Sequence, residues 1–250
     1  MELNQTLFHH FVAKADGIKV EHLCIGLGYT AVVNSQGGIG LAGTLFKDTA
    51  QCTKVRGYVD FEGGPALSLL VRITDSDPIQ RSMALALINS LNYEETLTLP
   101  EDRQNRELFD KLSLQKGRRV AMVGYFRPMA VWLKELGVEL EVFDLGRGLG
   151  SKDDFYQKLR NWAEVLIMSS TSILNQTTEE VLARSGTGVK TVLLGPSTPL
   201  AREPFAHLPV HMLAGMAVLD KVKVLKAVRH GKGTDRKSTR LNSSHRLRNR

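Results

Sequence analysis

The sequence predicts an α/β protein in two parts: an N-terminal α+β domain, then a Rossmann-like domain built as a three-layer sandwich around a parallel sheet. Three short apolar, β-branched runs in the second half lead to this prediction. Each ends in a junction rich in small or turn-forming residues, and a helical pattern follows two of them. In the first half strand patterns precede helical ones, which is typical of α+β domains. The three runs are Val120 to Val123, Val165 to Met168 and Val192 to Leu194.

The first domain, expected over residues 1–105, begins with apolar side chains at helical spacing over Leu3–Ala15. Two β-patterned runs then flank the turn-forming sequence Asn-Ser-Gln-Gly, which predicts a hairpin. The glycine-rich GGIGLAGT lacks the Lys-Ser/Thr pair of a phosphate-binding loop, so we expect a strand with close backbone packing. Two helices follow, each opened by a proline, and Asp77 is the expected cap of the second. These strands and helices are expected at residues 22–33, 38–45, 65–73 and 78–92.

The second domain is expected over residues 106–234, after a polar linker at 93–107. Strand and helix patterns alternate through it, and this alternation predicts a parallel sheet with helices on both faces. Gly137 is expected to end the first of its helices. The expected strands are residues 119–125, 139–143, 164–168, 191–194 and 211–219, and the expected helices are residues 128–136, 178–184 and 221–228.

The basic C-terminal tail changes the interpretation of charge. Residues 235–245 read DRKSTRLNSSH, which matches the in-frame translation of a common sequencing adapter. We therefore expect residues 235–250 to be non-native and the native sequence after about residue 234 to be missing. Without them the chain loses six basic side chains and one acidic side chain, so its formal charge falls from +7 to +2. A nearly neutral chain gives no electrostatic reason to expect nucleic acid as a partner.

Compartment and partners follow from absent features of the sequence. No apolar stretch reaches the roughly 18–20 residues of a membrane span, and the N-terminus lacks the pattern of a secretory signal. The two cysteines, Cys24 and Cys52, form no disulfide framework and are better explained as small core residues than as metal ligands. We expect a cytoplasmic protein that binds a small molecule and does not contact a membrane. The sequence does not predict the oligomeric state.

The first junction, GYFRPM, lies where parallel sheets bind ligands, just beyond the carboxyl end of a strand. It has one glycine, Gly124, where a dinucleotide-binding fingerprint has three, and the bulky Tyr125 stands in the approach to the helix. Asp144 follows about 20 residues later at the end of the second strand, where a carboxylate commonly binds ribose hydroxyls. An adenosine-type nucleotide such as NAD or S-adenosylmethionine is therefore one alternative for the ligand. Arg127 would either bind an anionic group or remain a solvated surface charge.

Hydroxyl side chains fill the second junction. Ser169 to Ser172 are followed by Asn175 and by two threonines that are expected helix caps. Free N–H groups at a helix start favour carboxylate or phosphate. The alternative is that these residues only cap the helix and shape the turn; four hydroxyls exceed what one cap needs, which favours binding. The third junction is the rigid turn Gly195-Pro196-Ser197-Thr198-Pro199, whose backbone would line the same cleft.

Well-known catalytic and metal-binding motifs are absent from the sequence. It contains no GxSxG, HExxH, CxxC or EF-hand loop. His207 and His211 stand four residues apart, but Pro209 between them prevents a continuous helical face. The residues therefore leave open whether the protein is an enzyme, and they predict no metal site made of Cys and His.

Taken together, several of these segments resemble a prokaryotic family labelled "putative heavy-metal chelation". In the second half the resemblance is carried by VAMVGYFRPM, VFDLG, AEVLIMSSTSILNQTTEEVL and VLLGPSTPL, and in the first half by LCIGLGYTAVV, GGIGLAG and SMALALINSLN. It covers roughly residues 10–232. It implies an enolase-N-terminal-like domain followed by a Rossmann-like domain, with a site in the cleft between them. It also implies a link to metal-chelating or cofactor-type small molecules, such as those of cobalamin metabolism.

The resemblance also implies a set of site positions. From the residues alone, Asn89 would be either a hydrogen-bonded core amide or a residue facing the cleft. Soft metals prefer thiolate and imidazole ligands, whereas these positions carry hydroxyls and amides. We therefore interpret chelation as the handling of a chelating small molecule. The implied positions are Tyr29, Thr30, Asn89, Gly124, Ser170, Thr171, Asn175, Gly195, Pro196 and Pro199.

Three functions remain in competition. The first is binding of a small polar, anionic or metal-chelating organic molecule in the interdomain cleft. The second is a nucleotide- or S-adenosylmethionine-dependent enzyme that modifies such a molecule, and the third is a metal-binding or metal-delivery protein. The cofactor is accordingly open between an adenosine-type nucleotide and a metal chelate. In the first hypothesis Ser170 and Thr171 hold an anionic group, Gly124 and Asp144 hold a second polar portion, and Tyr29 or Asn89 closes the site.

Overall fold

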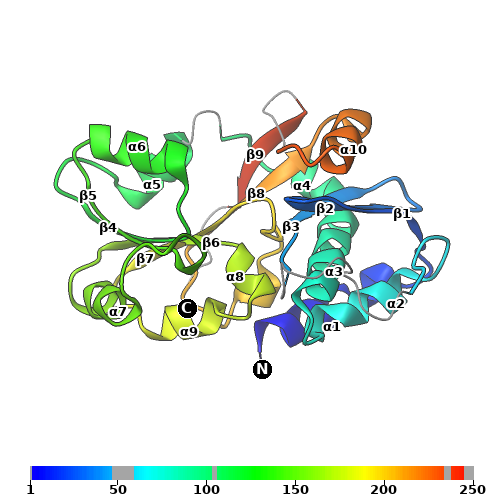
Figure 1. Ribbon diagram of the computed structural model, residues 1–250, viewed down its shortest axis with the longest axis horizontal. Coiled ribbons are helices and arrows are strands. Elements are labelled where there is room, and N and C mark those ends of the chain that lie inside the picture. Colours follow the sequence, from blue (N-terminus) through cyan, green and yellow to red (C-terminus); the bar gives the residue numbers. More distant parts are fainter. Residues whose placement is uncertain (1, 47–58, 103–105, 234–237, 245–250) are drawn as a thin grey trace.

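Two β-sheets with helices packed against them make up the protein (Figure 1). The computed structural model describes residues 2–46, 59–102, 106–233 and 238–244. An antiparallel sheet has the strand order β1-β2-β3, and a six-stranded sheet has the order β5-β4-β6-β7-β8-β9. In the larger sheet all neighbouring strands are parallel except β8 and β9. The predicted fold class, an α+β part followed by a part built on a parallel sheet, is confirmed.

Helix α3 (Pro78–Leu91) covers one face of the antiparallel sheet. Its cap is the predicted one, because the side chain of Asp77 accepts a hydrogen bond from the N–H of Ile79 at 3.1 Å. The sheet approaches the helix closely at Gly40, where a Cβ atom would lie 2.2 Å from the carbonyl oxygen of Ala86. The close packing predicted for the glycine-rich strand is therefore confirmed. The other elements here are α1 (Leu3–Ala15), β1 (Val20–Ile25), β2 (Tyr29–Asn34), β3 (Ile39–Gly43), α2 (Ala66–Leu70) and η1 (Val71–Thr74).

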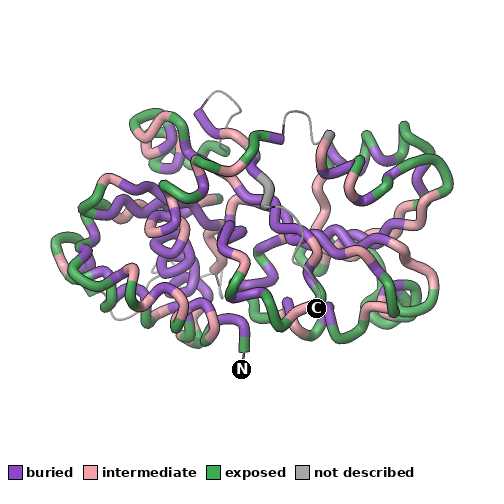
Figure 2. Tube along the Cα trace, turned by 180° about the vertical axis from the view of Figure 1, so that it is seen from behind, coloured by how far each residue is buried: buried purple, intermediate pink, exposed green. Residues whose placement is uncertain are grey.

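The larger sheet lies between two layers of helices (Figure 1). Successive side chains of a strand point to opposite faces. Val120 and Met122 accordingly pack with α5 (Arg106–Leu112) and α6 (Arg127–Glu135), whereas Ala121 belongs to the cluster on the other face. Figure 2 shows burial running along these central strands. The strands are β4 (Arg119–Val123), β5 (Glu139–Phe143), β6 (Val165–Ser169), β7 (Lys190–Leu194) and β8 (Met212–Val218); the helices of the second layer are α7 (Lys152–Asn161), α8 (Thr171–Leu174) and α9 (Thr178–Ala183).

The two halves of the chain share a hydrophobic cluster. Helix α10 (Lys221–Arg229) packs on the face of the antiparallel sheet that α3 leaves open. Val224 and Val228 of α10 are buried against Ala31 and Val33 of β2. The last helix of the C-terminal half thus covers the second face of the N-terminal sheet, so both faces of β2 are buried. The two remaining short helices are η3 (Leu145–Arg147) and η4 (Glu203–Phe205).

Residues Thr239–Ser244, expected to be translated adapter sequence, form strand β9 at the edge of the larger sheet. Asn242 is fully buried, and its side-chain amide donates to the carbonyl oxygens of Thr96 and Leu99 at 2.6 and 3.3 Å. An open sheet edge offers unpaired backbone N–H and C=O groups to a strand of any origin. The pairing of β9 with β8 therefore does not test whether this segment is native or translated adapter sequence.

The expected linker, the two cysteines and the expected lack of a membrane span can also be compared with the structure. Part of the expected linker at 93–107 is helical, as α4 (Tyr93–Thr98). Cys24 lies half-buried on β1, and Cys52 falls outside the described residues. No helix within the described part of the chain combines the length and the apolar character that crossing a bilayer demands.

Candidate functional site

A cavity of about 430 Å³ opens at the carboxyl ends of β4, β5 and β6. The chain leaves β4 toward β5 on one side and returns as β6 on the other, so the strand order reverses here. Open α/β sheets bind their ligands at this kind of position. The described residues that line it are Leu45, Val123, Gly124, Tyr125, Phe126, Phe143, Asp144, Leu145, Gly146, Arg147, Lys152, Tyr156, Ser169, Thr171, Ser172, Asn175, Thr177, Glu180 and Val181.

Gly124 begins the loop that leaves β4. Its φ of +84° lies in the left-handed region, and a Cβ atom there would meet the Cβ of Ser169 at 2.8 Å. Its N–H donates to the carbonyl oxygen of Phe143 on the neighbouring strand at 2.9 Å. Glycine is therefore needed for both conformation and space, and the first and second junctions are brought into contact.

Asp144 organises the opposite wall. Its Oδ2 accepts a hydrogen bond from the N–H of Tyr125 at 2.8 Å, and its Oδ1 accepts one from the N–H of Arg147 at 3.1 Å. The Nε of Arg147 lies 3.4 Å from Oδ2, and the same guanidinium stands 5.8 Å from the centre of the Tyr125 ring. The predicted ribose-binding carboxylate thus already joins two loops, although a carboxylate with four acceptor positions keeps capacity for a ligand.

The second junction supplies the hydroxyl side of the cavity. The hydroxyls of Ser169 and Thr171 lie 2.9 Å apart, and Thr171 is exposed. Asn175 follows at the end of α8, where its Oδ1 accepts a hydrogen bond from the hydroxyl of Thr177 at 2.6 Å. Hydroxyl and amide groups that line one cavity can donate to or accept from a polar ligand.

Helices α7 and α9 contribute a charged cluster to the same cavity. Lys152 Nζ lies 2.8 Å from the Oε1 of Glu180 and 5.6 Å from the centre of the Tyr156 ring. The hydrogen bond from Lys152 holds the pKa of Glu180 below its ordinary value, and that carboxylate in turn raises the pKa of Lys152. Burial raises the pKa of Tyr156, with a further contribution from Glu180. At neutral pH the cluster therefore presents an ammonium, a carboxylate and a neutral phenol.

Five predicted site residues lie outside the cavity lining, and three of them, Asn89, Pro196 and Ser197, lie at the contact between the two halves. Asn89 Nδ2 donates to the carbonyl oxygens of Leu41 and Pro196 at 2.7 and 3.2 Å. Of the two interpretations of Asn89, the hydrogen-bonded amide matches this geometry. Ser197 Oγ accepts from the N–H of Gly43 at 2.7 Å. The other two, Ser170 and Gly195, pack together: Ser170 is buried, and its Oγ lies 2.9 Å from where a Cβ on Gly195 would stand.

Three more predicted residues also lie away from the cavity lining. Tyr29 begins β2 and packs with the apolar cluster under α10, where burial raises its pKa. Thr30 is fully buried, and its hydroxyl lies 3.0 Å from that of Thr44. Arg127 is exposed at the start of α6. The predicted residues that the structure does bring together around the cavity are Gly124, Tyr125, Asp144, Thr171 and Asn175.

Four polar residues of the cavity were not predicted from the sequence: Arg147, Lys152, Tyr156 and Glu180. Three of them follow Asp144 within the segment LGRGLGSKDDFY, which has no strand pattern and little apolar periodicity. The position of this segment could have identified these residues. It follows the carboxyl end of the second strand, and open α/β sheets bind ligands beyond the carboxyl ends of their strands.

Within the described residues, no three His, Cys, Asp or Glu side chains gather as a metal site would require. Asp144 and Glu180 are the two described carboxylates of the cavity, and both already accept hydrogen bonds. Cys24 lies on β1, and burial raises the pKa of its thiol, which disfavours the thiolate that soft metals bind. The described polar side chains of the cavity are hydroxyls, one amide, two carboxylates and two cations.

The chain matches two family models that share one description, "Putative heavy-metal chelation". One covers residues 107–245 and the other residues 9–92. The chain belongs to this family. An uncharacterised protein of Methanocaldococcus jannaschii is 23% identical over 236 residues, which cover 90% of this chain and 88% of that protein.

Two crystal structures of family members with unknown function share the fold. The protein from Pyrococcus horikoshii aligns with a TM-score of 0.79 at 22% identity and covers 97% of this chain and 99% of its own. The protein from Desulfitobacterium hafniense DCB-2 aligns with a TM-score of 0.73 at 18% identity and covers 96% and 99%. At these identities the likeness establishes the shared fold.

Proposed function

We propose that the protein binds a small polar organic molecule, anionic or metal-chelating, in the cavity at the carboxyl ends of β4, β5 and β6. The observation that carries this proposal is the composition of one cavity at the strand-order reversal. Hydroxyl, amide and cationic side chains meet there beside aromatic rings. Ligand sites commonly combine an apolar lining with a few placed polar groups, and 430 Å³ is within their usual size.

The placement of groups suggests how such a molecule would lie. Thr171 and Asn175 would hydrogen-bond one polar portion, and the Gly124 loop would let a second portion approach the backbone closely. This differs from the expected arrangement, since Ser170 packs against Gly195 and its neighbours Ser169 and Thr171 line the cavity instead. The family description supports a metal-related role, and a metal would arrive bound to the organic ligand.

A thermal-shift screen on the full chain tests this proposal. The probes are S-adenosylmethionine and NAD, then citrate with and without cobalt or nickel, and finally the divalent metals alone. A ligand at 100 times its dissociation constant adds about 2.7 kcal/mol of stability, which for a chain of this size raises the midpoint by roughly 5–10 °C. We expect a shift with the chelators or their complexes.

Variants of the cavity locate the binding. Replacing Ser169 by Ala together with Thr171 by Val removes two hydroxyls without adding bulk. We expect this pair to weaken binding of the active probe at least tenfold. Thr6→Val, on α1 and away from the cavity, is the matched control. Equal affinity in the cavity variant and the control would rule out this cavity as the site.

A nucleotide- or S-adenosylmethionine-dependent enzyme is the second candidate. The position of Asp144 favours it, because the side chain stands at the end of the second strand and lines the cavity. Adenosine probes would then shift the midpoint, and Asp144→Ala would abolish that shift while leaving citrate binding measurable. A metal-delivery protein would instead purify with stoichiometric metal, which substitution of Cys24 and Cys52 would remove.

A further inference from the structure

Four aromatic side chains line the cavity. Tyr125 and Phe126 follow β4, Phe143 ends β5, and Tyr156 lies on α7. The ring of Phe143 packs against that of Phe155 with centroids 5.5 Å apart, so it has an aromatic neighbour that limits its movement. Aromatic walls favour a flat, conjugated ligand, because stacked and edge-to-face contacts stabilise such pairs beyond simple burial.

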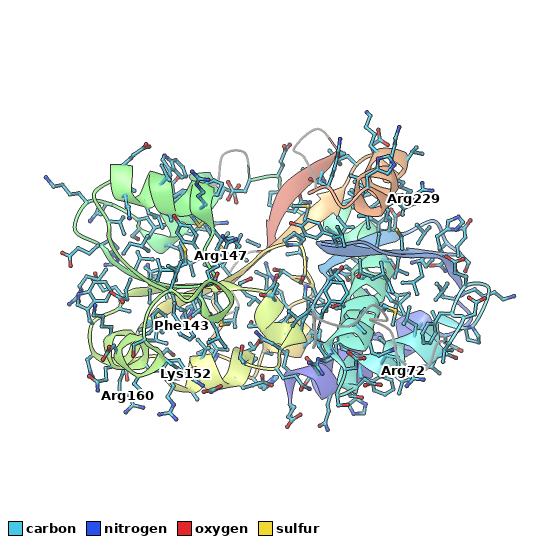
Figure 3. All side chains as sticks on the ribbon, viewed as in Figure 1. Arg72, Phe143, Arg147, Lys152, Arg160 and Arg229 are labelled. Atoms are coloured by element: carbon cyan, nitrogen blue, oxygen red, sulfur yellow. The ribbon has the colours of Figure 1, made fainter. Side chains whose placement is uncertain are left out.

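Two cations reach the same cavity from adjacent elements. Figure 3 shows Phe143 drawn between Arg147 and Lys152, and all three line the cavity. Each cation lies near an aromatic ring, Arg147 near Tyr125 and Lys152 near Tyr156. Among the described residues of the lining, these two are the Lys and Arg side chains.

Neither cation is held tightly by its carboxylate. The side chains of Arg147 and Lys152 are 62% and 54% exposed, and ion pairs made by cations this exposed contribute little to stability. A ligand carboxylate can therefore compete for each cation.

The protein carboxylates keep other donors when the cations turn to a ligand. Asp144 retains hydrogen bonds from the N–H groups of Tyr125 and Arg147. Glu180 retains its hydrogen bond with Tyr156 and the nearby charge of Arg184. Exchange of partners therefore leaves no carboxylate without a donor, which removes the main energetic objection to an anionic ligand.

We propose that the cavity selects a flat, conjugated dianion, with one anionic group bound by Arg147 and the other by Lys152. This inference rests on the proposed function and narrows its ligand class. The arginine would make a bidentate contact with its carboxylate, and the lysine a single charged one. The aromatic walls would hold the ring between them.

A set of related probes separates charge from shape and from chelation. Pyridine-2,6-dicarboxylate is a flat dianion that chelates metals, and benzene-1,3-dicarboxylate has the same charges without the ring nitrogen. Pyridine-2-carboxylate carries one charge, and pyridine-2,6-dicarboxamide carries none. Binding of each to the full chain is measured by titration calorimetry in metal-free buffer. We expect both dianions to bind at least tenfold more tightly than the monoanion, and the monoanion more tightly than the diamide.

Charge-matched variants then assign the contacts. Arg147→Gln and Lys152→Gln should each weaken dianion binding about tenfold and leave the diamide nearly unaffected. Arg160→Gln is the control, since Arg160 is an exposed residue of α7 that does not line the cavity. It removes the same charge, so its expected effect is less than twofold.

Three results would overturn the inference. They are equal binding of the diamide and the dianions, equal effects of Arg147→Gln and Arg160→Gln, and no binding of any of the four probes. The first two leave the proposed function standing, because the variant with Ser169→Ala and Thr171→Val tests occupancy of the cavity independently of these charges. If none of the four probes binds, the proposed function fails only if the thermal-shift screen with adenosine cofactors, chelators and metals also shows no shift.

Discussion

The side-chain amide of Asn89 donates a hydrogen bond to the carbonyl oxygen of Pro196 across 3.2 Å. This contact joins α3 to the loop after β7, between residues more than a hundred positions apart in the chain. A second contact, from the N–H of Gly43 to the hydroxyl of Ser197, joins β3 to the same loop. The relative position of the antiparallel sheet and the parallel sheet is thus fixed by polar groups as well as by apolar packing.

Replacing Asn89 by Leu should destabilise the protein by about 1–3 kcal/mol, because the carbonyl oxygens of Leu41 and Pro196 lose their donor. Urea denaturation measures this change. Asn161→Leu, at the exposed end of α7, is the control. A loss no larger than in the control would show that water replaces the amide without cost.

Replacing Gly124 by Ala should cost more than the same change at Gly17. Both residues have positive φ, so both variants bear the left-handed strain of about 1–2 kcal/mol. A Cβ at Gly17 has nothing within 4 Å, whereas one at Gly124 meets Ser169. The excess measured by urea denaturation isolates that crowding, expected at about 1–3 kcal/mol. Equal losses of unfolding free energy in the two variants would mean that Ser169 and β6 move aside without measurable cost.

Replacing Asp144 by Asn should loosen the cavity wall without unfolding the protein. An amide offers one acceptor oxygen where the carboxylate offers two, so the N–H of either Tyr125 or Arg147 loses its partner. We expect hydrogen exchange of these two amides to accelerate at least tenfold. Asp16→Asn, on an exposed residue after α1, should leave both rates unchanged. Unaltered exchange in Asp144→Asn would contradict this role.

Stability should fall as the pH drops below about 6.5 because of His10. Burial lowers its pKa from the ordinary 6.5, with Glu203 opposing and Lys14 reinforcing the shift. The unfolded chain therefore binds a proton at a pH where the folded protein does not, so the lost stability grows as the pH falls from 6.5 through the folded pKa. Urea midpoints at pH 7.5 and 5.5 should differ less for His10→Gln than for the parent. His9→Gln, an exposed neighbour, should behave like the parent.

A chain that ends at residue 234 should lose stability and keep its cavity. Removing β9 frees the edge of β8 and leaves the carbonyl oxygens of Thr96 and Leu99 without the amide of Asn242. The described cavity residues all precede Arg184 and lie on other strands. We expect a lower thermal midpoint with unchanged affinity for whichever probe the full chain binds. Loss of binding would tie the tail to the site.

Much of the fold was predictable from the sequence, because strand and helix periods are local properties. The helix beginning at Pro78 and its Asp77 cap were predicted where they occur. Helix α7 was missed, since its buried side chains are Phe155 and Leu159 and the rest of it is polar. Two buried positions make too weak a period to recognise.

The sequence indicated which loops line the candidate cavity, but not which of their side chains do so. The loops after β4 and β6 do meet at the cavity, as parallel strands require. Which hydroxyls line the cavity was not predictable. Ser170 packs against Gly195, whereas its neighbours Ser169 and Thr171 line the cavity. The direction of each side chain depends on how the end of β6 packs against the neighbouring strands. The sequence pattern of a single strand does not carry this information.

The strand order of the larger sheet also sets a timescale. Strands β2 and β3 are joined by a short turn, and such a hairpin closes in about 1–10 μs. The pairing of β4 with β6 must wait for a far longer loop to close, as the contact of Arg119 with Glu164 shows at 45 residues' separation. Parallel pairings of this kind form slowly and expose apolar strand edges meanwhile. The candidate cavity lies on this pair, so it can form only after this slow parallel pairing is complete.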